Sequence, residues 1–83
     1  MRTIRITKAA SKTLERMPRN VANTIIGKIE QYARDPASLA NNVVKLQGLP
    51  GYRLRVGDWR VVFDDDGVVM IVEKIAPRGS VYG

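Results

Sequence analysis

Three arginines, Arg53, Arg55 and Arg60, are the residues of this sequence best spaced to do chemistry together. They fall within the stretch GYRLRVGDWRVVF, residues 51–63. A guanidinium is a rigid fork of N–H donors that binds phosphate or carboxylate oxygens through paired hydrogen bonds. The set therefore has two interpretations. It is either a site for an anion, above all the phosphates of a nucleic acid, or a basic face whose long side chains are simply solvated.

The same stretch predicts the element that would hold these arginines. Apolar residues alternate with Arg53 and Arg55, which is the pattern of a half-buried strand, and a second strand-like run follows the turn residues Gly57-Asp58. The expected register pairs Val56 with Trp59, Arg55 with Arg60 and Leu54 with Val61. One face is then apolar and includes Trp59, while the other carries the three arginines. Like charges directly opposite each other are unfavourable, so the Arg55–Arg60 pair needs an explanation.

Composition limits the chemistry that is available. The sequence contains no cysteine and no histidine, which excludes disulfides, thiolate metal sites and an imidazole base. Its net charge of +6 favours a polyanion or an acidic protein as partner, although the same excess could serve solubility. The N-terminus does not read as a signal peptide, and no apolar run is long enough to span a bilayer. We expect a cytoplasmic protein with no membrane partner.

Helical periodicity precedes the hairpin. Thr7 is a suitable N-cap for a helix running to about Met17, and Asn20 can cap a second helix over about residues 21–34. The second helix should stop at Asp35-Pro36, because the residue before a proline avoids the α region. Apolar residues at helical spacing predict one buried stripe on each helix. Those expected in the core are Leu14, Val21, Ile25 and Ile29.

Strand patterns lie on both sides of the helices, over residues 2–6, 43–46 and 68–75 in addition to the hairpin. The order is strand, helix, helix and then further strands, written β-α-α-β-β-β. This order predicts the α+β fold class, with an αα-hairpin packed on a mostly antiparallel, twisted sheet of about four strands. No linker or internal repeat interrupts it, so residues 1–83 should form a single domain.

Three consecutive carboxylates, Asp64, Asp65 and Asp66, precede Gly67. Such a run could attract a divalent cation, but the longer spaced ligand pattern of a calcium loop is missing. Asp66-Gly67 is instead a strong hairpin signal. We therefore expect a solvated turn and no metal site here.

Three segments together resemble the RelE/ParE toxin superfamily of bacterial toxin–antitoxin systems. They are Lys45-Leu46 with Gly48, the hairpin of residues 51–63, and Arg78-Gly79-Ser80-Val81-Tyr82. The resemblance covers essentially the whole chain. It implies a toxin held silent by a small, acidic cognate antitoxin that commonly binds operator DNA, so that contact with the operator would be indirect. RelE-like members are ribosome-dependent mRNA endonucleases, whereas ParE-like members act on DNA gyrase.

The resemblance also implies roles for individual residues. RNA cleavage in this class uses the ribose 2′-hydroxyl as nucleophile and needs neither metal nor cofactor. Arg60 matches the phosphate-stabilising arginine, Arg78 the C-terminal basic residue that stabilises charge or assists departure of the leaving group, and Tyr82 the terminal tyrosine that acts as base or orients the substrate. Phosphate and RNA binding would fall to Arg53, Arg55 and Lys45. Arg53 and Arg55 replace lysines of well-studied nucleases, and arginine is a poor proton shuttle.

Three functions remain open on the sequence. The first is a RelE-like mRNA endonuclease that acts on the ribosome and inhibits translation; the retained basic residues and Tyr82 favour it. The second is a ParE-like inhibitor of gyrase. The third is an attenuated toxin whose main activity is antitoxin binding, which the replacement of lysines by arginines keeps open. Tyr82 could also be a packing residue that pins the tail to the sheet.

Overall fold

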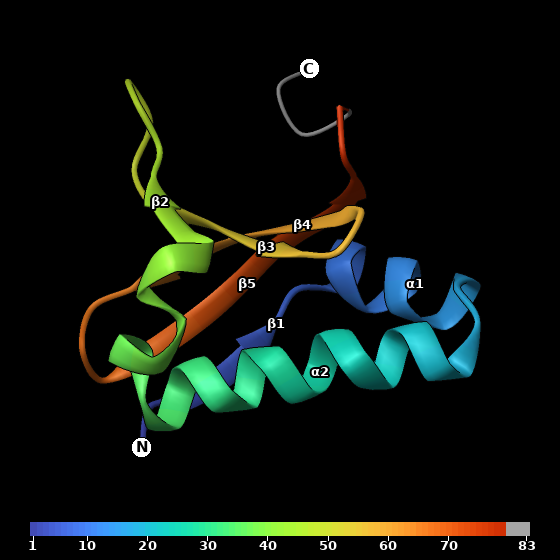
Figure 1. The fold of residues 1–83 in the computed structure, drawn as a ribbon, viewed down its shortest axis with the longest axis horizontal. Helices are drawn as coiled ribbons and strands as arrows, with labels where there is room; N and C mark the ends of the chain where they lie inside the picture. The colour runs from blue at the N-terminus through green and yellow to red at the C-terminus, as the bar shows by residue number, and fades with distance from the viewer. Residues whose placement is uncertain (80–83) are drawn as a thin grey trace.

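The computed structural model describes residues 1–79 as a five-stranded sheet with helices against it (Figure 1). The strands are β1 (Thr3–Ile6), β2 (Val43–Lys45), β3 (Tyr52–Val56), β4 (Trp59–Asp65) and β5 (Val69–Pro77). Their order across the sheet is β1-β5-β4-β3-β2, and all neighbours are antiparallel except β1 and β5. The predicted α+β class is confirmed. The sheet has one strand more than the expected pattern, and its first strand is parallel to its last.

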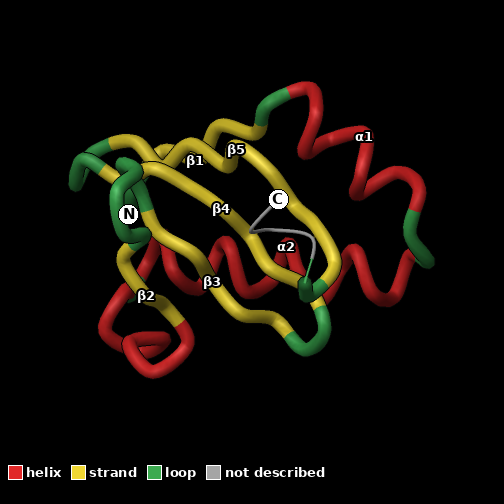
Figure 2. The backbone as a smooth tube through the Cα atoms, turned by 90° about the horizontal axis from the view of Figure 1, so that it is seen from above, coloured by secondary structure: helices red, strands yellow, loops and turns green. Residues whose placement is uncertain are grey.

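Three helical segments follow β1: α1 (Lys8–Arg16), α2 (Arg19–Arg34) and the 3-10 segment η1 (Pro36–Asn42). Figure 2 looks onto the sheet with α2 behind it, so α2 covers one face, and within residues 1–79 no helix lies over the other, which we call the open face. None of the helices within residues 1–79 combines the length and the apolar character needed to cross a membrane.

The predicted N-cap agrees with the structure for α1 and differs from it for α2. Thr7 is the N-cap of α1, and its hydroxyl accepts a hydrogen bond from the Ala10 amide at 3.2 Å, as predicted. The predicted cap of α2 is wrong, because Pro18 is the N-cap residue and Asn20 lies within the first turn. Pro18 has a φ of −55°, and this fixed angle leads the chain directly into a helix that starts at Arg19.

The core lies between the helices and the covered face of the sheet. Ile25 and Ile29 of α2 are fully buried, as predicted, whereas Leu14 and Val21 are only half-buried at its margin. The largest fully buried side chains are Phe63, Ile25, Ile29, Leu54, Met70, Val61 and Val72. Full burial of one such side chain contributes about 1.5–3 kcal/mol. The sheet is therefore firmly fixed on its α2 side.

The β3–β4 hairpin has the register that the sequence predicts. Val56 pairs with Trp59, Arg55 with Arg60 and Leu54 with Val61. Gly57 occupies the left-handed region at a φ of +57°, which glycine adopts without strain. Except for Val62, the apolar side chains of this hairpin face α2, and Trp59 among them is half-buried. The arginines consequently belong to the other face.

A β-bulge in β5 changes which residues face the core. Phe63 pairs with Val72, but the preceding residue of β4, Val62, pairs with Lys74, so Glu73 is the extra residue. After the bulge, Ile75 returns to the core, where it is 3% exposed, and Lys74 is exposed. A bulge of this kind redirects the side chains that follow it.

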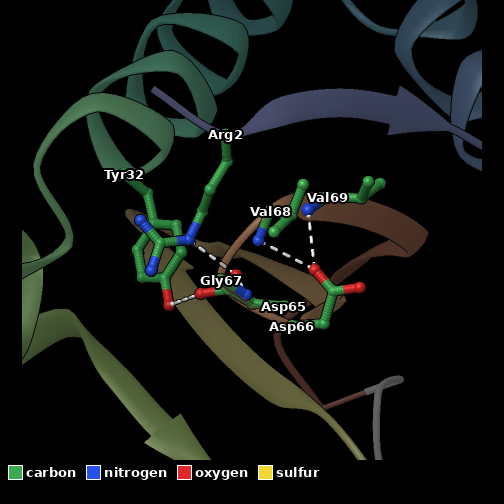
Figure 3. Close-up of polar contacts among 7 residues, drawn as sticks. All are labelled: Arg2, Tyr32, Asp65, Asp66, Gly67, Val68 and Val69. Carbon is green, nitrogen blue, oxygen red and sulfur yellow. Dashed lines mark hydrogen bonds and ion pairs between the residues drawn. The ribbon is translucent and has the colours of Figure 1, made fainter.

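At the end of the sheet remote from the β3–β4 turn, Asp65 joins three elements (Figure 3). Its carboxylate accepts hydrogen bonds from Arg2 Nε at 2.6 Å, the Tyr32 hydroxyl at 2.8 Å and the Gly67 amide at 2.9 Å. The side chain of Asp65 is only 7% exposed, so the prediction of a solvated aspartate turn is wrong for this residue. The exposed neighbour Asp66 caps the turn, accepting from the Val68 and Val69 amides at 2.8 and 2.7 Å.

Tyr32 and Asp65, two of the ionisable groups in this contact, have shifted pKa values. Burial, followed by the hydrogen bond to Asp65, raises the pKa of Tyr32 to about 12. For Asp65 burial acts to raise the pKa, but the bonds from Gly67, Tyr32 and Arg2 outweigh it and hold the pKa below the ordinary aspartate value. The contribution of this contact to the free energy of unfolding therefore depends on pH.

Candidate functional site

The open face of the sheet carries a cluster of basic side chains. Cross-strand partners share a face, so the Arg55–Arg60 pair forms one row of this face and the Arg53–Val62 pair forms the next. No helix lies over this side of the sheet in Figure 2. The structure thus brings together the three arginines that the sequence singled out.

These arginines surround a shallow hollow of about 150 Å³. Its lining residues are Asn41, Asn42, Val44, Arg53, Arg55 and Arg60. The end of η1 supplies the two asparagines, and β2 supplies Val44, which is 48% exposed. Guanidinium and amide N–H groups around a small apolar patch make a suitable surface for a phosphate with part of its ribose or base.

The Gly57–Asp58 turn holds two of the predicted catalytic residues at one end of the sheet. Arg60 Nη1 donates to the carbonyl oxygens of Gly57 at 2.9 Å and Trp59 at 3.0 Å. The backbone N–H of Arg78 donates to the Asp58 carbonyl at 2.7 Å. A guanidinium has five N–H donors, so bonds from one nitrogen orient Arg60 and leave it capacity to bind an anion. Arg78 is exposed and lies beside the same turn.

Lys45 lies elsewhere. It pairs with Tyr52, whose side chain has the parity of the covered face, and so it is on the opposite side of the sheet from Arg53. It lines a separate groove of about 400 Å³ together with Asp64, Asp65 and Asp66. The structure does not bring Lys45 together with the arginines. Tyr82, the remaining predicted site residue, lies outside the described residues.

Lys74 is a basic residue of the open face that the sequence pattern did not identify. It pairs with Val62, which in turn pairs with Arg53, so these three residues form one row across the sheet. Strict alternation from the buried Val72 would place Lys74 in the core. The available signal was the spacing of Val72 and Ile75, both apolar and three positions apart, which a regular strand cannot bury on one face.

Two carboxylates limit the basic surface on one side. Asp64 lies two residues after Val62 on β4 and shares its face, and Glu73 is the bulge residue of β5. A hydrogen bond with Asp64, helped by burial, raises the pKa of Glu73. Within residues 1–79 no three carboxylates, or other metal-binding side chains, are grouped so as to hold a metal ion. The positive charge is therefore concentrated toward the β3–β4 turn.

Comparisons with known proteins agree on the fold and on the family of proteins to which the chain is similar. The chain matches the family described as ParE toxin of type II toxin-antitoxin system, parDE, over residues 4–82. It is 26% identical to a chain of the archaeal RelE–RelB complex from Pyrococcus horikoshii, with a TM-score of 0.76 and coverage of 96% of this chain and 98% of that one. No curated protein gives a significant match.

Two further solved structures show the same fold at lower identity. The RelB–RelE antitoxin–toxin complex from Methanococcus jannaschii matches at 24% identity and a TM-score of 0.73, covering 94% of both chains. The intact Escherichia coli RelBE complex matches at 20% identity and a TM-score of 0.74, covering 96% of this chain and 99% of that one. The family match spans nearly the whole sequence. The chain therefore belongs to the ParE toxin family, within the RelE/ParE superfamily, and is a toxin of a type II toxin–antitoxin module.

Proposed function

We propose that this toxin is a metal-independent, ribosome-dependent mRNA endonuclease that inhibits translation. The observation that carries the proposal is the cluster of Arg53, Arg55 and Arg60 around one hollow on a face that no helix covers. A flat basic surface of this kind fits an RNA strand laid across a sheet better than it fits a small substrate, for which an enclosed pocket would be needed.

The proposed reaction is an internal transfer at one phosphate of the message. The ribose 2′-oxygen bonds to the adjacent phosphorus while the bond from phosphorus to the 5′-oxygen breaks. The products are a 2′,3′-cyclic phosphate and a 5′-hydroxyl. A base takes the proton of the 2′-hydroxyl, and a donor supplies one to the departing 5′-oxygen. In this assignment Tyr82 is the base, Arg78 donates a hydrogen bond to the departing 5′-oxygen, and solvent supplies the proton that this oxygen takes up.

The arginines would act by electrostatics. Negative charge grows on the non-bridging oxygens as the phosphorus becomes five-coordinate, and fixed N–H donors stabilise that charge most when they are already oriented. Arg60, held by the carbonyls of Gly57 and Trp59, has this kind of orientation. Arg55 stands directly opposite it, and together they offer two guanidinium forks to one phosphate. Lys45, on the other face, would contact RNA only outside this site.

A cognate antitoxin is the second proposed partner. The similar structures from Pyrococcus horikoshii, Methanococcus jannaschii and Escherichia coli are all complexes of a RelE toxin with RelB. An acidic antitoxin would complement the net charge of +6 of this chain and silence it by covering the basic face. Contact with operator DNA would be made by the antitoxin.

Gyrase inhibition is the alternative that a specific observation favours, because the matching family is described by ParE. The decisive experiment incubates purified toxin with a defined mRNA, with and without ribosomes, and maps cuts by primer extension; a gyrase supercoiling assay runs in parallel. We expect cuts that require ribosomes and vanish in Arg60→Ala but persist in Arg16→Ala, an exposed arginine of α1. Gyrase inhibition without cuts would replace the proposal, and inactivity in both assays would favour an attenuated, antitoxin-binding toxin.

A further inference from the structure

We propose that Lys74 is a substrate-positioning residue, whose ammonium group binds a second phosphate of the RNA across the sheet from the arginines. The inference rests on the proposed function and extends it by giving the strand a path. The path runs from the hollow at Arg53 over Val62 to Lys74 on β5.

Register fixes the spacing of this row. Arg53 and Val62 are direct partners between β3 and β4, and Val62 and Lys74 are direct partners between β4 and β5. Adjacent strands are separated by about 4.8 Å, which puts the backbones of Arg53 and Lys74 about 10 Å apart. The half-buried Val62 forms an apolar floor between two cationic walls. Such a floor accepts a ribose or the face of a base while phosphates are bound on either side.

The bulge that aims Lys74 is held in place by the N-cap of α1. The Thr7 hydroxyl donates to the Glu73 carbonyl at 2.8 Å, and the Thr7 amide donates to the Val72 carbonyl at 3.0 Å. These two hydrogen bonds from Thr7 fix the bulge in position. Without it, alternation would turn Lys74 toward the core, where an unpaired ammonium is strongly unfavourable. This placement directs the exposed lysine to the face that carries the three arginines.

Two carboxylates on one side of the row restrict the path of the RNA further. Asp64 and Glu73 lie beside the row on the side away from the β3–β4 turn, and their carboxylates repel phosphate. A strand that engages Arg55 and Arg60 is therefore guided over Val62 and past Lys74. Lysine suits this position because its charge sits on a flexible stem and can follow a phosphate without a fixed orientation.

The test measures binding of a labelled single-stranded RNA whose 2′-hydroxyls are methylated, which prevents cleavage. Full-length wild type, Lys74→Ala, Lys74→Arg and Arg55→Ala are compared by fluorescence anisotropy at several salt concentrations. Lys12→Ala, an exposed lysine of α1 on the helical side, is the matched control. Circular dichroism verifies that each variant is folded.

Each phosphate contact to a single strand contributes about 0.7 to the slope of log affinity against log salt. Loss of one contact in Lys74→Ala should reduce the slope by that amount. Between 50 and 200 mM salt, wild type should then lose about 2.6-fold more affinity than Lys74→Ala. Lys74→Arg should keep the wild-type slope, since it keeps the charge, and Lys12→Ala should match wild type.

The outcomes separate this inference from the function on which it rests. A wild-type slope in Lys74→Ala, with a reduced slope in Arg55→Ala, would overturn the role of Lys74 and leave the RNA site standing. Failure of Lys74→Arg to restore the slope would also overturn it. Unchanged binding in both Lys74→Ala and Arg55→Ala would mean that RNA does not bind this face, and the proposed function would fail with the inference.

Discussion

Arg55 and Arg60 lie directly opposite each other across the β3–β4 hairpin. Two like charges in this arrangement repel, and this repulsion lowers the stability of the fold slightly. The repulsion is partly offset at Arg60, because the carbonyl oxygens of Gly57 and Trp59 attract its guanidinium. An anion bound between the two arginines would relieve the rest of the repulsion. Stability and function should therefore respond in opposite directions when the charge of Arg55 is removed.

Arg55→Gln should make the free toxin more stable. We expect the free energy of unfolding to rise by about 0.5 kcal/mol at low salt, and the gain to shrink at high salt as the repulsion is screened. Urea denaturation at two ionic strengths measures it. Arg34→Gln, an exposed arginine at the end of α2, serves as the control and should show no such gain. A salt-independent effect in Arg55→Gln would show that repulsion is not its cause.

Arg60→Ala should abolish growth inhibition and leave the fold intact. The side chain lies on the open face and its described contacts are to backbone carbonyls of one turn, so its loss should cost less than about 1 kcal/mol. Induced expression in bacteria measures toxicity, and circular dichroism of the purified variant measures folding. An undiminished toxin would contradict the role of Arg60, and an unfolded variant would contradict the prediction that the fold stays intact.

Ile25→Asp should unfold the domain or nearly so. Ile25 is 0% exposed in the core between α2 and the sheet, where an unpaired carboxylate finds no hydrogen-bond partner. We expect a loss of more than about 4 kcal/mol, against about 1 kcal/mol for the control Ile25→Val. Thermal denaturation followed by circular dichroism distinguishes the two. Retained stability in Ile25→Asp would contradict the packing of α2 on the sheet.

The sequence predicted the hairpin and missed the consequences of long-range pairing, for a physical reason. Alternation of apolar and basic residues, with Gly57-Asp58 between the runs, specifies both the register and the arginine face. The bulge at Glu73 depends instead on contacts from Thr7, 66 positions away, so local alternation misplaces Lys74. Likewise, nothing local in Asp65 indicates that Arg2 and Tyr32 will bind it.

Asp65→Asn should weaken the domain at neutral pH and flatten its acid sensitivity. The pKa of Asp65 is lowered in the folded state, so the carboxylate contributes stability above its unfolded pKa and loses it as pH falls through the folded pKa. We expect a cost of about 2 kcal/mol at pH 7, shrinking below about pH 4. Urea midpoints from pH 7 to pH 2.5 measure both. A constant difference across that range would contradict the assignment.

Tyr32→Phe should act at the other end of the pH scale. The pKa of Tyr32 is raised to about 12, so the neutral hydroxyl favours the folded state below the unfolded pKa near 10, and this contribution is lost as pH rises through about 12. We expect the variant to lack the fall in stability that wild type shows above about pH 10. Denaturation midpoints at pH 8 to 11.5 provide the measurement, and an unchanged alkaline fall would disprove the role of Tyr32.

Two glycine substitutions should change the free energy of unfolding in opposite directions. Gly51 has a φ of +103°, and an added Cβ would lie 2.8 Å from both the Phe63 carbonyl oxygen and Asp64 Oδ1, so Gly51→Ala should destabilise by more than about 2 kcal/mol. Gly27 lies inside α2 with nothing within 4 Å of its added Cβ, and Gly27→Ala should stabilise by up to about 1 kcal/mol. Chemical denaturation of both variants tests the pair; the same sign in both would contradict these backbone assignments.

The interior position of β5 in the sheet has a consequence for how the toxin is made. β5 lies between β1 and β4, yet it is the last strand of the described chain to be synthesised. While β5 is still inside the ribosomal exit tunnel, β1 lacks its partner, the N-cap of α1 has no bulge to bind, and Lys74 is absent from the basic face. Local elements such as α2 and the β3–β4 hairpin can form early, but the sheet closes only afterwards. The complete sheet, and with it the full basic face, can therefore form only after β5 has emerged from the ribosome.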